Sequence, residues 1–168
     1  MLFIFCGLPG TGKSALAREL AHRLGAVYLR IDTIEYAIAP TEDTPIDETG
    51  YRVAYAVAED NLRLGQSVVA DSVNPVRLTQ ECWRNVAKRA GVSCVEIMVV
   101  CSDRAEHRRR IESRKIDIAG LRGPTWQDVL MRAFEPLDRQ DIVLDTAGQS
   151  VEQSVAALQA ALSVHRPV

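Results

Sequence analysis

Residues Gly7–Ser14, which read GLPGTGKS, have the types and spacing that binding a polyphosphate requires. They match G-x-x-x-x-G-K-[ST] at every fixed position. Glycines let a loop turn its backbone N–H groups toward an anion, and they leave room for phosphate oxygens. Lys13 can bridge the β- and γ-phosphates, while the Ser14 hydroxyl can bind Mg²⁺. The motif therefore predicts a site for a nucleoside triphosphate, expected to be ATP, with Mg²⁺.

The sequence around this motif has the order that such a loop needs. The apolar run Leu2–Cys6 precedes it and is typical of a buried strand. Apolar residues at helical spacing follow over Lys13–Leu24, and Gly25 ends that pattern. This context disfavours the alternative of a chance glycine-rich turn. We expect nucleotide contacts from Gly7, Gly10, Thr11, Gly12, Lys13, Ser14 and Ala15.

Two aspartates follow predicted strands. Asp32 comes after the strand expected over 26–31, and Asp71 comes after the one expected over 67–70. Ligands of parallel α/β sheets bind beyond the carboxyl ends of the strands. Phosphoryl transfer uses one carboxylate on the attacking hydroxyl and another on Mg²⁺. We assign Asp32 to catalysis and acceptor binding, and Asp71 to the metal. The alternative for each is a helix N-cap.

Asn74 and Arg77 lie just beyond Asp71 and are candidates for contact with the acceptor. Asn74 precedes Pro75, so it is equally typical of a turn. Arg77 is equally typical of an exposed arginine at the start of a helix, which the sequence predicts over 77–90.

A strongly basic helix is predicted over 103–115. Arg110 and Arg114 are four residues apart and are expected to share a face, where their charges would serve catalysis by neutralising the transferring phosphoryl group. Arg104, Arg108 and Arg109 are expected on a solvated face with Glu106 and Glu112. Gly120, Gly123 and Pro124 predict a mobile loop over 116–124, so that 110–124 would form a lid.

The remaining pattern alternates strands and helices. It predicts further strands over 94–101 and 142–144, a loop over 40–50, and helices over 51–64, 126–134 and 151–162. Such alternation indicates an α/β fold with a parallel sheet covered on both faces. The 168 residues fit a single domain, 1–168.

Composition limits the partners. A net charge of -2 disfavours nucleic-acid binding, because nucleic-acid grips are normally basic. The four cysteines lack metal-site spacing, which indicates reduced thiols and a cytoplasmic protein. The apolar N-terminus is too short for a signal peptide or membrane span. We expect no membrane partner, and the oligomeric state stays open.

With these motifs in this order, the chain resembles the small P-loop kinases grouped as AAA-type predicted kinases, related to gluconate kinase, shikimate kinase, chloramphenicol phosphotransferase and zeta-toxin kinases. The resemblance covers nearly the whole length. It is carried by Gly7–Ser14, Asp32, VADSVN at 69–74, RIESRK at 110–115 and IVLDTA at 142–147.

The resemblance implies a P-loop NTPase three-layer sandwich with a five-stranded parallel sheet in the order 2-3-1-4-5. It implies that Asp32 acts as base or acceptor anchor, that Arg110 packs on adenine, and that Arg114 lies near the phosphates. The loop after Asp145 would line the adenine pocket. Shikimate kinases carry a second acid where this chain has Ile34, which argues against shikimate as the acceptor.

The sequence therefore predicts an ATP-dependent kinase that phosphorylates a hydroxyl of a small molecule. One alternative is a regulatory switch module that binds ATP and hydrolyses it slowly. A polynucleotide or tRNA kinase is disfavoured by the net charge of -2. Neither the identity of the acceptor nor the preference for ATP over GTP follows from the motif, because one fold hosts many substrates.

Overall fold

The computed structural model describes residues 1–39, 48–114, 118, 123–135 and 139–165. Its centre is a five-stranded sheet with the order β2-β3-β1-β4-β5, and every neighbouring pair is parallel. The strands are β1 Leu2–Cys6, β2 Val27–Arg30, β3 Val68–Asp71, β4 Cys94–Val100 and β5 Ile142–Asp145. The expected sheet and its strand order are confirmed.

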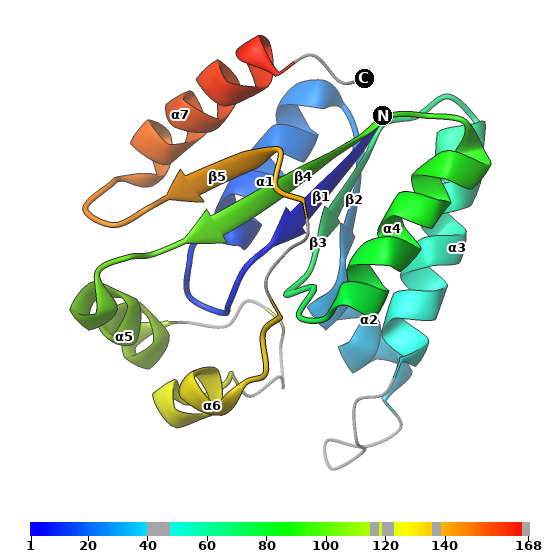
Figure 1. Ribbon diagram of the computed structural model, residues 1–168. Coiled ribbons are helices and arrows are strands. Elements are labelled where there is room, and N and C mark those ends of the chain that lie inside the picture. The colour runs from blue at the N-terminus through cyan, green and yellow to red at the C-terminus, as the bar shows by residue number, and fades with distance from the viewer. Residues whose placement is uncertain (40–47, 115–117, 119–122, 136–138, 166–168) are drawn as a thin grey trace.

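Helices cover both faces of this sheet (Figure 1). Helices α1 and α7 lie on one face, while α3 and α4 lie on the other. The helices are α1 Lys13–Leu24, α2 Ile31–Ile38, α3 Thr49–Arg63, α4 Arg77–Ala90, α5 Arg104–Ser113, α6 Trp126–Met131 and α7 Val151–Val164. The fold is the three-layer P-loop NTPase sandwich that the sequence predicts.

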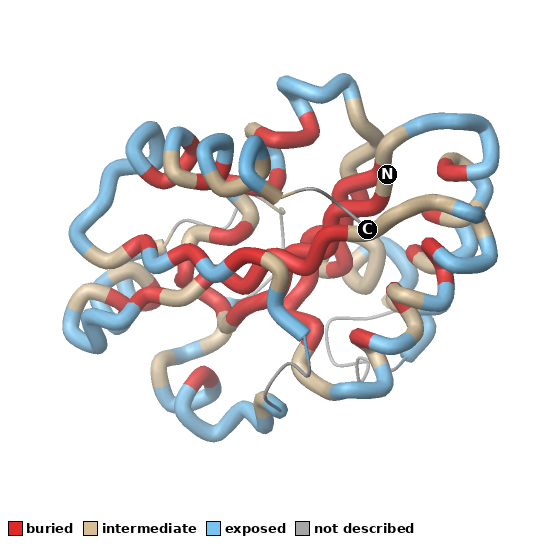
Figure 2. Tube along the Cα trace, turned by 45° about the horizontal axis from the view of Figure 1, so that its top comes forward, coloured by how far each residue is buried: buried red, intermediate tan, exposed pale blue. Residues whose placement is uncertain are grey.

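Strand β1 shows why the sheet is the core of the molecule. All of its residues are buried, and successive side chains point to opposite faces. Leu2, Ile4 and Cys6 join the core under α3 and α4. Phe3 and Phe5 join the core under α1 and α7. A strand that is apolar on both faces needs a helix layer on each side, and Figure 2 shows the strands as the buried centre.

Helix α2 is absent from the elements that the sequence pattern predicts. It begins directly after β2, so Ile31 opens the helix and is not the last residue of the strand. The segment is mostly apolar, and the periodicity of so short a helix is hard to separate from a continued strand. As a result, Asp32 lies within a helix.

The basic helix is shorter than expected. It ends at Ser113, and Arg114 has an extended backbone with φ −63° and ψ 126°. The predicted lid over 110–124 lies largely outside the described residues, as does most of the predicted loop over 40–50. Helix α6 ends at Met131, before the predicted Phe134.

Helices α5 and α6 lie beyond the carboxyl ends of the strands, on the side where the loop after β1 also lies (Figure 1). All four cysteines are free. Among the described residues, no helix has the length and apolar character needed to cross a membrane.

Candidate active site

The loop between β1 and α1 presents unused backbone donors. Gly12 is the N-cap of α1, and neither a side-chain cap nor an acidic residue occupies the first turn. No described residue accepts a hydrogen bond from the backbone N–H of Gly12, Lys13 or Ser14. These N–H groups and the partial positive charge of the helix end form a site for an anion. Ser14 and Ala15 lie in this same turn.

The structure revises the reason for two of the glycines. A Cβ atom at Gly7 would collide with the Val99 carbonyl oxygen of β4, and one at Gly10 would lie 2.7 Å from Ile111 Cδ1 of α5. The space at these positions is therefore filled by the protein itself rather than reserved for phosphate oxygens. At Gly12 the nearest atom, Thr146 Cγ2, would be 3.7 Å away. Its φ of 92° is the reason for glycine there.

Lys13 is buried, with 6% of its surface exposed. Within the described residues it makes no hydrogen bond or ion pair. A lysine ammonium group that is not engaged within the protein can bind an anionic ligand. Its place at the first residue of α1 puts it beside the unused N–H groups.

Asp71 is the last residue of β3 and is almost completely buried, with 2% exposed. Its Oδ2 accepts a hydrogen bond of 2.7 Å from the Tyr28 hydroxyl. Its Oδ1 is buried and has no hydrogen-bond partner among the described residues. Burial raises the pKa of Tyr28, and the neighbouring Asp71 adds to this effect. Asp71 therefore belongs to β3 and does not cap a helix.

Asp32 lies in the first turn of α2, whose N-cap is Arg30, so the N-cap alternative for Asp32 is wrong. Its carboxylate is 34% exposed and lies 3.9 Å from the Arg30 guanidinium, which is 6% exposed. In the β2–β3 register Arg30 is paired with Asp71. A buried arginine thus stands between the two predicted acids. Arg30 belongs to no sequence motif, and a charged residue in an otherwise apolar strand is the one signal in the sequence that could have indicated it.

Asn74 is fully buried and is used inside the protein. Its side-chain amide donates to Cys6 Sγ at 3.2 Å, and its backbone N–H donates to the Tyr51 hydroxyl at 3.1 Å. Its φ of 52° is the left-handed conformation that asparagine tolerates in turns. This geometry fits the turn alternative. The Asn74 Oδ1 is buried without a partner among the described residues, and a contact of Asn74 with the acceptor stays a prediction. Arg77 is exposed at the start of α4, where its backbone N–H donates to Glu135.

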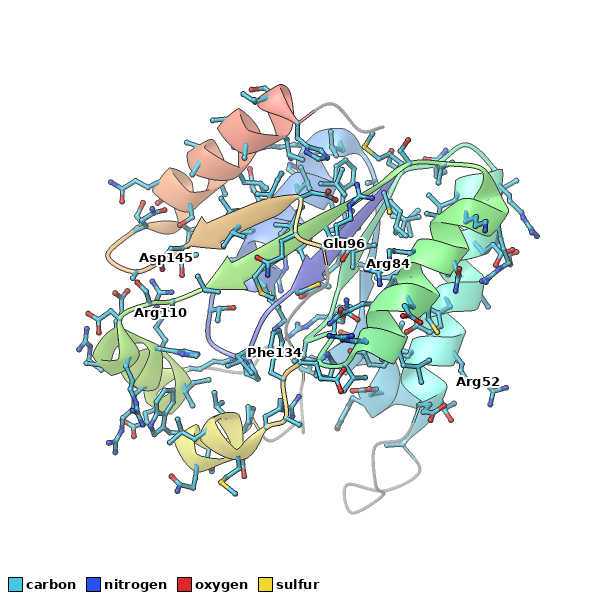
Figure 3. All side chains as sticks on the ribbon, viewed as in Figure 1. Arg52, Arg84, Glu96, Arg110, Phe134 and Asp145 are labelled. Carbon is cyan, nitrogen blue, oxygen red and sulfur yellow. The ribbon has the colours of Figure 1, made fainter. Side chains whose placement is uncertain are left out.

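Arg110 joins α5 to the loop after β5. Its guanidinium donates to the Thr146 hydroxyl at 2.7 Å, to the Thr146 carbonyl at 2.8 Å, and to Glu106 at 2.6 Å. The Thr146 hydroxyl in turn donates to the Thr11 carbonyl at 2.8 Å. Figure 3 shows Arg110 close to Asp145 at the end of β5. The predicted nucleotide arginine therefore lies against the phosphate loop and the segment expected to line the adenine pocket.

Arg114 is the C-cap of α5, directly after the last helical residue, Ser113. Its φ of −63° is still helical, while its ψ of 126° turns the following chain away from the helix axis. The role of Arg114 near the phosphates stays a prediction.

His107 is a contact to the phosphate loop that we had not expected. It is buried, and its Nε2 lies 2.7 Å from the Pro9 carbonyl oxygen. Its ring meets Trp126 of α6 edge to face, with centroids 5.2 Å apart. Only its position one turn before Arg110 was visible in the sequence, and this spacing alone indicates no role.

Carboxylates hold α5 and the loop after β5 in place. Asp103 accepts from two backbone N–H groups at the start of α5, and Glu106 accepts from Gly148 at 2.8 Å. These backbone hydrogen bonds hold the pKa of Asp103 and of Glu106 below their ordinary values. Asp145 accepts from Ser102 and Ala147, and these hydrogen bonds lower its pKa as well.

The comparison with known families identifies this arrangement. A family model described as an AAA domain matches residues 2–137. The chain belongs to this family. No curated protein matches the chain by sequence.

Several solved structures of similar fold are described as kinases. A candidate kinase from Chloroflexus aurantiacus is 25% identical, with a TM-score of 0.72 over 96% of this chain and 95% of that one. A gluconokinase from Sinorhizobium meliloti is 18% identical, with a TM-score of 0.68 over 96% of this chain and 90% of that one. An APS kinase from Mycobacterium tuberculosis, in complex with AMPPNP and APS, is 19% identical, with a TM-score of 0.68 over 96% of each chain.

These likenesses give this member of the AAA domain family a kinase-like P-loop fold. The last two identities are low and concern the fold alone.

Proposed function

We propose that this chain is an ATP-dependent kinase that transfers the γ-phosphate to a hydroxyl group of a small molecule. The observation that carries the proposal is that three groups lie at the carboxyl ends of three adjacent strands. The phosphate loop, with its unused N–H donors, follows β1. The buried Asp71 carboxylate is at the end of β3, and the partly exposed Asp32 carboxylate follows β2. Strand order places β3 between β1 and β2.

The polyphosphate of ATP would be held by the backbone N–H groups of Gly12, Lys13 and Ser14, with the Lys13 ammonium on the β- and γ-phosphates. Arg110, fixed against Thr146, is the candidate for the adenine side. Because Arg110 already has three hydrogen bonds, it would meet the base in a fixed orientation.

The residues present fit a magnesium ion. The Ser14 hydroxyl and the free Asp71 Oδ1 are oxygen ligands, which Mg²⁺ prefers. The described residues contain no group of three or more His, Cys, Asp or Glu side chains that could hold a metal. Phosphate oxygens and water would complete the coordination, as is usual for Mg²⁺. The ion would neutralise charge that develops on the phosphate oxygens.

In the transfer step, the proton of the acceptor hydroxyl goes to Asp32. The acceptor oxygen bonds to the γ-phosphorus, the bond from that phosphorus to the β–γ bridging oxygen breaks, and the bridging electrons leave with ADP. The Asp32 carboxylate takes the hydroxyl proton or holds the hydroxyl in line. Arg30, whose guanidinium lies 3.9 Å from the Asp32 carboxylate, would help to orient it.

The first experiment is a transfer screen with γ-labelled ATP over sugars, sugar acids, nucleosides, antibiotics and hydroxylated amino acids. The proposal expects labelled product with at least one acceptor class and none with Lys13→Ala. Slow hydrolysis without transfer to any class would support the switch module instead.

The second experiment tests the role of Asp32. Because Asp32 is not a helix cap, Asp32→Asn removes the charge without breaking a cap. We expect near-normal ATP affinity and a loss of transfer rate of about 10²–10⁴-fold, the usual range for a general base. Asp60→Asn, an exposed acid on α3, is the matched control and should behave as the parent protein. Equal turnover in both variants would remove Asp32 from the mechanism.

A further inference from the structure

The two oxygens of the Asp71 carboxylate have different surroundings. Oδ2 accepts the 2.7 Å hydrogen bond from the Tyr28 hydroxyl. Oδ1 is buried and has no partner among the described residues. A buried acceptor without a hydrogen bond is costly, so Oδ1 is the oxygen of this carboxylate that is suited to bind a ligand.

The pairing of β2 with β3 determines which oxygen of the Asp71 carboxylate faces Tyr28. In the β2–β3 register Tyr28 lies beside Val69 and Arg30 lies beside Asp71, so Tyr28 and Asp71 are diagonal neighbours on one face. Aromatic side chains can span this diagonal. The Tyr28 ring also packs against the core cluster between the sheet and α1. Both the ring and the carboxylate are thus held by strand pairing and packing.

This face is the one covered by α1, the helix that begins at the phosphate loop. Phe5 of β1 is the register partner of Asp71, and Leu16 of α1 lies in the same core cluster as Phe5. The free Oδ1 therefore belongs to the layer between the sheet and α1. Ser14 is the second residue of α1, in its first turn.

We propose that Tyr28 is a positioning residue, which orients the Asp71 carboxylate so that Oδ1 is available to the Mg²⁺ ion, or to a water of that ion, in the nucleotide site. The inference rests on the proposed function and adds to it a residue of a strand that carries no recognised motif. A tyrosine with only a structural role would stabilise the fold without changing how nucleotide affinity depends on Mg²⁺.

The test is calorimetric titration with ADP, in excess Mg²⁺ and in EDTA, so that no acceptor is needed. The ratio of the two affinities measures the Mg²⁺ linkage. Partners that orient metal ligands are typically worth 10–100-fold in metal affinity, and we expect Tyr28→Phe to lower the ratio by about tenfold while affinity in EDTA stays unchanged. Tyr55→Phe is the matched control, since it also removes one hydroxyl hydrogen bond, to the Thr79 carbonyl.

A double-mutant cycle shows whether Tyr28 acts through Asp71. Asp71→Asn should lower the Mg²⁺ linkage, and Tyr28→Phe should lower it no further in that background. A second variant, Tyr28→His, keeps a possible donor and should retain more linkage than Tyr28→Phe.

The possible outcomes distinguish failure of the role proposed for Tyr28 from failure of the proposed kinase function. If the parent protein binds ADP with a clear Mg²⁺ linkage and Tyr28→Phe has the same linkage, the role of Tyr28 is refuted and the kinase proposal stands. A loss of affinity that is equal in Mg²⁺ and in EDTA also refutes it, because the effect would then be structural. Absence of ADP binding by the folded parent protein would overturn the proposed function itself.

Discussion

Arg110 and Thr146 are joined by two hydrogen bonds, one from the guanidinium to the threonine hydroxyl at 2.7 Å and one to its carbonyl at 2.8 Å. The same hydroxyl donates to the Thr11 carbonyl. One buried threonine therefore connects the phosphate loop, α5 and the loop after β5. Nucleotide affinity should depend on this residue although it carries no charge.

We predict that Thr146→Val weakens binding of ATP. The substitution keeps the volume but removes the hydroxyl, which leaves the Thr11 carbonyl without its donor and frees one side of Arg110. The cost of unpaired buried groups is about 1–3 kcal/mol, part of it in stability and part in affinity. Calorimetric titration with ATP measures the loss of affinity, and thermal unfolding measures the loss of stability. Thr79→Val, which removes a local hydroxyl bond to Val76 in α4, serves as control.

Lys13→Ala should abolish transfer and greatly weaken triphosphate binding while the fold stays intact. The buried ammonium has no ion pair to lose among the described residues, so removing it should not destabilise the protein without ligand. Calorimetry with ATP and Mg²⁺ checks affinity, and circular dichroism checks folding. Unchanged affinity in the variant would exclude the phosphate loop as the binding site.

Alanine substitutions at two glycines with positive φ distinguish the cost of backbone strain from the cost of a steric collision. Gly65→Ala should cost about 1 kcal/mol, because φ is +84° but a Cβ there meets nothing within 4 Å. Gly7→Ala should cost more than about 3 kcal/mol, because the new Cβ meets the backbone carbonyl of Val99, which cannot move without shifting β4. Urea unfolding measures both; equal losses would contradict the packing of β4 on the loop.

The loop after β5 should lose stability in acid. Hydrogen bonds from Ser102 and Ala147 lower the pKa of Asp145, so its contribution is present above the unfolded pKa of about 3.9 and is lost as pH falls through the lower folded value. Asp145→Asn should therefore be less stable than the parent at neutral pH, by under about 1 kcal/mol since the carboxylate is solvent-screened.

This difference should be smaller at about pH 2.5 than at neutral pH, because the Asp145 carboxylate becomes protonated in both states as the pH falls through its folded pKa. Thermal unfolding of the parent and of Asp145→Asn at the two pH values makes the comparison. Asp60→Asn, an exposed acid on α3, should show no comparable change between them. A gap between parent and Asp145→Asn that persists in acid would show that charge is not the cause.

The sequence by itself determined the features that depend on local chemistry. The glycines, Lys13 and Ser14 define an anion site because backbone turns and a helix start need only neighbouring residues. Apolar runs alternating with helical periodicity predict the parallel sheet, and the strand order came from the family resemblance. The arginine that joins the phosphate loop, Arg110, was also among the predicted residues.

Tertiary structure decided whatever depends on residues distant in the chain. Only the β2–β3 pairing brings the Tyr28 hydroxyl to Asp71. Only packing of α3 on the β3–α4 turn buries Asn74 beside Tyr51. A hydrogen bond or a burial energy belongs to a pair of groups, so its value appears only when the fold has placed both partners.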